Sequence, residues 1–240
     1  MSIWGKLGGA AAGFLLGGGP IGALIGAYAG HVLIDADLAA VNPDEPGLAF
    51  TIAIIALGAK LAKSDGAVTR EEEEAFSRVF RVPAAESANV QRIFNLARQD
   101  TAGYEAYASQ IARIFRGNPA MLEDVMDGLF EIAKADGVFH PGEQAFLERV
   151  SEIFGFAPNV YRRIRASHFP DAADPYVILG VSYEANEDEV RRTYLMLVKE
   201  NHPDSLIARG VPEEFVRLAT DKLAAINTAY EKIRQERDFR

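Results

Sequence analysis

Apolar residues recur at helical spacing through the middle of the chain, and no stretch shows the sustained alternation that is typical of a strand. From Phe50 the apolar positions continue through Ile54, Leu57 and Leu61, so a helix with a wide apolar face is expected there. Further helices are expected at 70–81, 86–99, 104–116, 119–135, 142–154 and 158–167. Because the connections between them are short, the pattern predicts an all-α fold with a helical bundle at 48–168.

The C-terminal residues 174–240 show a second helical pattern, with clearer start and stop signals. A short helix is expected near 174–179, and a longer one starts after Asn186, whose side chain can cap it. The longer helix must end before Pro203, because proline lacks the backbone N–H that continues a helix. A third helix is expected at about 212–235, so the segment predicts an antiparallel helical hairpin with short flanking helices.

The 28 residues from Leu7 to Ile34 contain no Asp, Glu, Lys or Arg. This run exceeds the roughly 20 residues that an apolar helix needs to cross a bilayer. Its glycines recur every four residues, which on a helix would form a smooth groove for close packing of a second helix. The glycines of this zipper are Gly18, Gly22, Gly26 and Gly30. The pattern predicts membrane association through residues 1–34 and, through the zipper, a homodimer.

The path of this segment stays open at the level of sequence. Three glycines before Pro20 interrupt a helix, so the segment could be one kinked helix, a hairpin of two short helices or a weakly ordered tail. Lys6 precedes the run and Asp35 follows it, which weakly favours an N-terminus in the cytoplasm.

Composition narrows the class of protein. The net charge of −9 argues against sequence-independent binding of nucleic acid, which depends on a basic surface. The chain has no cysteine, so it can form neither a disulfide nor a Cys-ligated zinc site. No nucleophile motif or phosphate-binding loop is present, and we expect a protein that is not an enzyme.

Proline-containing breakers divide the chain into parts. The sequence NPDEPG at 42–47 and the sequence FPDAADP at 169–175 are typical of linkers. The expected division is a membrane segment at 1–34, a linker at 35–47, a helical domain at 48–168, a linker at 169–173 and a second domain at 174–240.

The middle domain contains an internal repeat. The sequence LAKSDGAVTREEEEAF at 61–76 is similar to IAKADGVFHPGEQAF at 132–146, at a constant offset of 71 residues. Each copy indicates a helix, an Asp-Gly turn and a new helix, and local capping explains much of the pattern. The carboxylates that match between the copies are Asp65, Glu72, Asp136 and Glu143.

This duplicated pattern resembles the tellurite-resistance TerB-like helical domain. In that family the acidic pairs have been suggested to bind a divalent cation, which would assign Asp65, Glu72, Asp136 and Glu143 as ligands. The alternative is that these residues only cap helices. No other cofactor is expected.

Four features of the C-terminal domain occur together. They are YVILGV at 176–181, the pair Arg191-Arg192 before Tyr194, the tripeptide His202-Pro203-Asp204, and INTAYE at 226–231. This combination resembles a J-domain. The resemblance implies that the tripeptide engages an Hsp70 (DnaK-type) chaperone and triggers its ATP hydrolysis. It also implies that Arg191, Arg192, Tyr194 and Lys199 contribute to docking on that chaperone.

The sequence departs from the J-domain pattern on the docking helix. Leu195 and Met196 follow the tyrosine where two basic residues are usual. Asn201 stands where an aromatic residue is common, and Ser205 stands where a basic residue often occurs. Fewer charges give weaker electrostatic steering, so we expect weaker affinity or a dedicated partner.

Taken together, the three parts resemble the DjlA-type membrane-anchored co-chaperones of bacteria. The resemblance implies a location at the inner membrane with a cytoplasmic J-domain, or else in the cytoplasm. An alternative function is a cation-binding stress or envelope sensor, in which the TerB-like domain acts and the J-domain is secondary.

Overall fold

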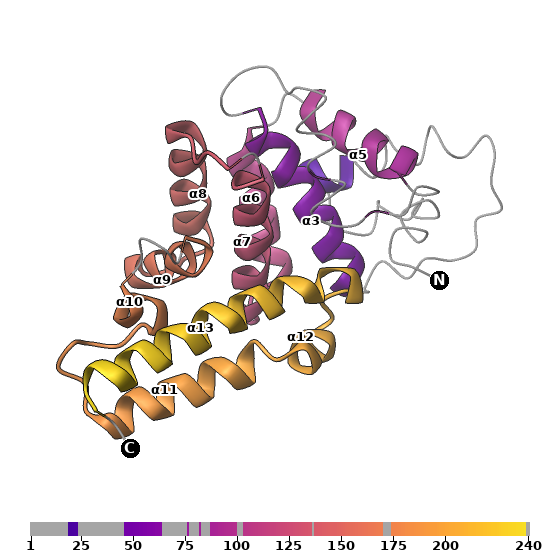
Figure 1. Cartoon of the computed structure of the whole chain (residues 1–240). Coiled ribbons are helices and arrows are strands. Elements are labelled where there is room, and N and C mark those ends of the chain that lie inside the picture. The colour runs from indigo at the N-terminus through magenta and orange to yellow at the C-terminus, as the bar shows by residue number, and fades with distance from the viewer. Residues whose placement is uncertain are drawn as a thin grey trace. The chain divides into compact units, whose positions relative to one another are not determined.

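The structure is a computed structural model, and it describes residues 19–23, 46–63, 76, 82, 87–99, 103–135, 137–169 and 174–238. The chain divides into two compact units, Met1–Phe154 and Gly155–Arg240. All regular elements in the described residues are helices, which confirms the predicted all-α class (Figure 1).

The first unit is built around a central apolar helix. Helix α3 (Pro46–Leu61) packs against α5 (Ser87–Gln99), α6 (Tyr104–Ile114) and α7 (Pro119–Ala133). Helix α8 (Pro141–Ile153) packs against α6 and α7. Apart from the half-buried Lys60, the α3 side chains whose burial is described are buried on every side of the helix, as expected of a helix that has no polar face.

Close packing in this unit uses the lack of a side chain at Gly58. A Cβ atom at Gly58 would lie 2.6 Å from Cδ1 of Ile132 on α7. Thr51, the buried polar residue of α3, donates its hydroxyl hydrogen to the Gly47 carbonyl at 2.8 Å. The helix therefore buries its hydroxyl without leaving it unsatisfied.

The second unit contains the helical hairpin. Its elements are α9 (Pro158–His168), α10 (Pro175–Leu179), α11 (Glu187–Glu200), α12 (Pro203–Arg209), the 3₁₀ turn η3 (Glu213–Phe215) and α13 (Val216–Glu236). Helices α11 and α13 lie side by side and run in opposite directions, as predicted (Figure 1). The core of this unit contains Ala166, Tyr176, Ile178, Leu179, Ala185, Val190, Leu197, Ile226, Ala229 and Ile233.

Two further helices belong to the second unit. Helix α9, which lies within the range predicted for the middle domain, packs against α10 and α13 and contributes Ala166 to the core of the second unit. Helix α12 lies between the helix expected to end before Pro203 and the helix expected to begin at about 212, where the sequence predicts no helix. It forms because Pro203 suits the first helical position and Gly210 ends the helix with φ 94°.

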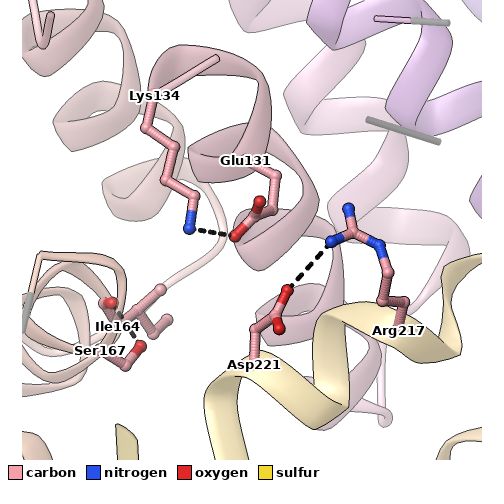
Figure 2. A network of polar contacts seen from close by, with 6 residues as sticks. All are labelled: Glu131, Lys134, Ile164, Ser167, Arg217 and Asp221. Carbon is pink, nitrogen blue, oxygen red and sulfur yellow. Dashed lines mark hydrogen bonds and ion pairs between the residues drawn. The ribbon is translucent and has the colours of Figure 1, made fainter. Parts of the chain in front are cut away.

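Polar contacts within single helices are shown in Figure 2. At the C-terminal end of α7 the ammonium of Lys134, the capping residue, lies 2.5 Å from the carboxylate of Glu131. In α13 the guanidinium of Arg217 lies 3.2 Å from Asp221, and in α9 the Ser167 hydroxyl donates to the Ile164 carbonyl at 2.7 Å. These pairs span three or four residues, the spacing that brings side chains together on a helix.

Only a short part of the N-terminal apolar segment is described. Residues 19–23 form a helical turn, in which Ile21 is buried and donates its backbone N–H to Gln110 Oε1 of α6 at 2.9 Å. Of the zipper glycines, Gly22 lies in this turn, whereas Gly18, Gly26 and Gly30 lie outside the described residues. Across the described ranges, no helix combines the length and apolar character needed to cross a membrane.

Candidate functional site

Helix α11 begins with local capping. The Asn186 side chain accepts a hydrogen bond from the Glu189 backbone N–H at 3.0 Å, and the Glu189 carboxylate accepts one from the Asn186 N–H at 2.9 Å. The acidic residues of the first turn also interact favourably with the positive end of the helix dipole. The predicted start of the helix at Asn186 is thus confirmed.

Tyr194 joins α11 to α13. Its ring stacks on that of Tyr230 with centroids 4.0 Å apart and planes at 10°. Its hydroxyl donates to Asn227 Oδ1 at 3.1 Å. The resemblance to a J-domain implies that Tyr194 contributes to partner docking, and in the structure its contacts also hold the helical hairpin together.

Side chains of the following turn and of α12 fix the end of α11. Asn201 Nδ2 donates to the Leu197 carbonyl (2.8 Å), Ser205 Oγ to the Lys199 carbonyl (2.6 Å) and Arg209 Nη1 to the Glu200 carbonyl (2.7 Å). The last carbonyls of a helix have no partner within the helix, so the bonds to the Lys199 and Glu200 carbonyls satisfy groups that would otherwise face water. The Leu197 carbonyl also accepts the Asn201 backbone N–H at 3.0 Å. They also tie the turn and α12 to the end of α11.

Asn201 has an interior position in this arrangement. Its side chain is buried while it donates to the Leu197 carbonyl. The sequence marks Asn201 as a departure at a position where an aromatic is common. The structure gives the residue a local function, because its side-chain amide adds a second hydrogen bond to a carbonyl that already accepts the Asn201 backbone N–H.

The tripeptide 202–204 lies at the exposed start of α12. The Asp204 backbone N–H donates to His202 Nδ1 at 3.2 Å, so His202 caps α12 and Pro203 occupies its first position. His202 Nδ1 lies 3.6 Å from Asp204 Oδ2, and the two side chains are 52% and 88% exposed. A neutral imidazole that accepts at Nδ1 carries its hydrogen on Nε2. The tripeptide therefore presents an imidazole and a carboxylate in a fixed local geometry.

The predicted basic residues lie on the exposed face of α11. The side chains of Arg191, Arg192 and Lys199 are exposed. Arg192 Nε donates to the Asp188 carbonyl at 3.2 Å. The structure thus places the three basic residues on one helix, whose last turn is hydrogen-bonded to the helix that His202 caps.

Of the four carboxylates predicted as metal ligands, only Glu143 lies in the described residues. Its carboxylate accepts a hydrogen bond from the His140 backbone N–H at 2.9 Å, as a capping residue does at a helix start. Asp65, Glu72 and Asp136 lie outside the described residues. Within the part of the chain that is described, no group of three or more acidic or histidine side chains could hold a metal ion. The cation site stays a prediction.

Three buried acidic side chains on α7 were not predicted from the sequence. They are Asp124, Asp127 and Glu131, which follow one another at intervals of three and four residues. That spacing places them on one side of the helix, and the ion pair with Lys134 accompanies Glu131. Their spacing in the sequence could have indicated a shared side, but not that this side is buried.

Comparisons with known proteins agree with the arrangement of the parts. The family model of Tellurite resistance protein TerB matches residues 51–166, and that of the DnaJ domain matches residues 174–238. The family model of the Co-chaperone DjlA transmembrane domain matches residues 1–42. These matches confirm the predicted order of the three parts and support membrane anchoring.

Similar curated proteins extend over the whole chain. The chain is 29% identical to the Co-chaperone protein DjlA of Coxiella burnetii, with full coverage of both chains. It is 27% identical to the protein of the same name from Photobacterium profundum, over 99% of this chain and all of the relative. The identity to the Escherichia coli strain K12 protein of that name is 26%, again over both full lengths. No solved structure matches the chain.

Proposed function

We propose that this chain, which belongs to the DjlA-like co-chaperones with a TerB domain followed by a J-domain, binds an Hsp70-type chaperone and stimulates its ATP hydrolysis. The observation that carries the proposal is the exposed tripeptide His202-Pro203-Asp204 at a turn that is hydrogen-bonded to the end of α11. The chain itself performs no bond chemistry in this function. It acts as a regulator, and the partner hydrolyses the ATP.

Pre-organisation explains how so small a motif could act. Three side-chain bonds to the carbonyls of Leu197, Lys199 and Glu200 fix the backbone around the tripeptide before any partner arrives. A partner therefore does not have to order this turn, and less of the interaction energy is lost to conformational entropy. The imidazole of His202 and the carboxylate of Asp204 can then favour one conformation of the partner through differential contacts.

In the proposed function, the N-terminal segment anchors the protein to a membrane. Residues 1–42 match a transmembrane family model, and we assign them to the inner membrane with the J-domain on the cytoplasmic side. A homodimer through the glycine zipper would double the number of J-domains at one membrane site. The acidic net charge of −9 gives no support for a nucleic-acid partner.

The test is single-turnover ATP hydrolysis by the host Hsp70, with the full chain held in detergent micelles. The parent chain should accelerate hydrolysis, and His202→Gln should remove at least about nine-tenths of the acceleration, which corresponds to about 1.4 kcal/mol of coupling. Asp204→Asn should have a similar effect, because it removes the charge but retains the shape.

A control variant separates loss of the motif from loss of the fold. Asp221→Asn alters an exposed ion pair of α13 with Arg217 and should leave the acceleration unchanged. All variants should have the helical circular dichroism of the parent. Full acceleration by a folded His202→Gln chain would refute the proposed function.

A further inference from the structure

The outer face of α11 exposes two large apolar side chains next to each other. Leu195 is 54% exposed and Met196 is 50% exposed, in a helix that buries Val190 and Leu197 on its other side. Single exposed apolar residues are common on protein surfaces. An adjacent pair in the middle of a basic helix face is less easily explained by chance.

Helix geometry places this pair between charged residues. Side chains four positions apart lie next to each other on a helix, which gives one row of Arg191, Leu195 and Lys199 and a second row of Arg192, Met196 and Glu200. In the first row a cation stands on each side of Leu195. In the second row Met196 has a cation on one side and a carboxylate on the other. The centre of the face is therefore apolar, with cations predominating around it.

The cations of the first row are available to another molecule. Among the described residues, the side chains of Arg191 and Lys199 form no hydrogen bond or ion pair. The guanidinium of Arg192 makes a single bond, from Nε to the Asp188 carbonyl, and retains its other donors. An acidic surface could thus pair with these groups without first breaking an intramolecular ion pair of Arg191 or Lys199.

The apolar–basic face of α11, made of Arg191, Arg192, Leu195, Met196 and Lys199, is continuous with the tripeptide. The Lys199 carbonyl accepts the Ser205 hydroxyl hydrogen at 2.6 Å, and the Glu200 carbonyl accepts a bond from Arg209 at 2.7 Å. These bonds join the end of this face to the turn that carries His202. A partner that reaches His202 is therefore positioned to cover the face as well.

We propose that Leu195 and Met196 dock into an apolar depression on the Hsp70 whose rim is acidic, so that burial of these two side chains contributes to the choice of Hsp70. The inference rests on the proposed function and adds the chemistry of the partner surface. Charge complementarity requires carboxylates opposite Arg191, Arg192 and Lys199. The apolar pair requires a contact that excludes water at the centre, where anchoring side chains contribute most to affinity.

A second copy of the same chain fits this face less well. In a two-fold symmetric contact the same patch occurs on both sides, so three cations would face the same three cations. Like charges brought together in an interface oppose association. A dimer that buried Leu195 and Met196 would also have to bring these like charges together.

The test compares two double variants of the full chain in the ATPase titration with the host Hsp70, at low and at high salt. Leu195→Ala/Met196→Ala should raise the concentration for half-maximal stimulation about tenfold, by a similar factor at both salt concentrations, since apolar contact is weakly screened. Arg191→Ala/Lys199→Ala should raise it mainly at low salt and flatten the salt dependence. The maximal stimulation should be unchanged in both, because His202 and Asp204 are intact.

The matched control is Val138→Ala, which truncates an apolar side chain of the first unit that is 53% exposed. It should leave the titration unchanged. Alanine is a good helix former, so the α11 variants should keep the circular dichroism and melting temperature of the parent.

Two outcomes would overturn the inference. One is a Leu195→Ala/Met196→Ala titration equal to that of the parent, while His202→Gln still abolishes stimulation. The other is conversion of a dimeric parent to a monomer by the same apolar variant in sedimentation, which would assign the pair to self-association. Full stimulation by His202→Gln would instead refute the proposed function, so the two failures are distinguishable.

Discussion

Helices α3 and α11 have similar lengths, 16 and 14 residues, but bury their apolar side chains differently. Each large apolar side chain of α3 for which burial is described is enclosed by neighbouring helices of the first unit. Helix α11 buries Val190 and Leu197 against the core of its unit and leaves Leu195 and Met196 in solvent. The same class of residue thus stabilises the fold in one helix and is available for contact in the other.

This difference shows that apolar character alone does not indicate a function in the core. In α3 the apolar residues occur all round the helix, and neighbouring helices cover each side of it, so these side chains are buried. In α11 the side of the helix on which a residue lies determines whether its side chain is buried. Residues 195 and 196 lie on the side that faces away from α13. Variants can break or sharpen this contrast, since they should change stability in α3 and partner binding in α11.

The largest expected effect on stability comes from the core of α3. Phe50→Ala should lower the free energy of unfolding of the first unit by about 3–5 kcal/mol, because it leaves a cavity among completely buried side chains. Leu195→Ala should change stability by no more than about 0.5 kcal/mol. Urea unfolding followed by circular dichroism measures both. Equal losses for the two variants would contradict the contrast between the helices.

A smaller effect is expected at the contact between α11 and α13. Tyr194→Ala should destabilise the second unit by about 2 kcal/mol, since it removes a half-buried ring that stacks on Tyr230. Tyr194→Phe keeps the ring and loses the hydroxyl bond to Asn227, and should cost about 1 kcal/mol. Hydrogen exchange of the α11 and α13 amides reads out both changes.

The two variants of Tyr194 also distinguish a function in the fold from a function in docking. If the ring stabilises the hairpin and does not contact the partner, Tyr194→Phe should stimulate the Hsp70 as the parent does. A Phe variant with parental stability and greatly reduced stimulation would instead give the hydroxyl a direct part in docking.

A loss of stability no larger than that of Tyr194→Ala is expected at the end of α13. Arg237 donates from Nε to the Tyr176 hydroxyl at 2.8 Å, from Nη1 to the Ala185 carbonyl at 2.5 Å and from Nη2 to the Tyr183 carbonyl. Its guanidinium also lies over the Tyr176 ring, 5.0 Å from the centroid. Arg237→Ala should therefore lower the stability of the second unit by about 1–2 kcal/mol.

Arg237→Lys is the matched variant for this contact. Lysine keeps the positive charge but lacks the planar guanidinium that donates to three acceptors. Arg237→Lys should therefore recover only part of the stability that Arg237→Ala loses. Thermal melting of the three chains gives the comparison. Full recovery by lysine would show that charge alone accounts for the contact.

Much of the second unit could be predicted from local sequence signals. The caps at Asn186 and the stop before Pro203 gave the limits of α11, because capping and the missing proline N–H act over a few residues. Helix α12 has only seven residues and one buried apolar side chain, Leu206. So short a helix shows no apolar periodicity, and only Pro203 and Gly210 mark its two ends.

Other features depend on contacts between residues far apart in the chain. The packing of Ala166 into the core of the second unit leaves no periodic signal, since alanine is also common on helix surfaces. The contact of Tyr194 with Asn227 and Tyr230 joins positions more than 30 residues apart. A sequence motif can list Tyr194 with the docking residues, but only the packed hairpin shows the contacts that Tyr194 makes with α13.

The central claim is that His202, held at the start of α12, contacts the Hsp70. Four histidines occur in the chain, so nuclear magnetic resonance of a full chain labelled with ¹³C in its histidine rings can follow each one. On addition of ATP-bound Hsp70, the His202 signal should shift or broaden in proportion to the bound fraction, whereas that of His140 in the first unit should not. An unchanged His202 signal at concentrations that stimulate ATP hydrolysis would contradict the account.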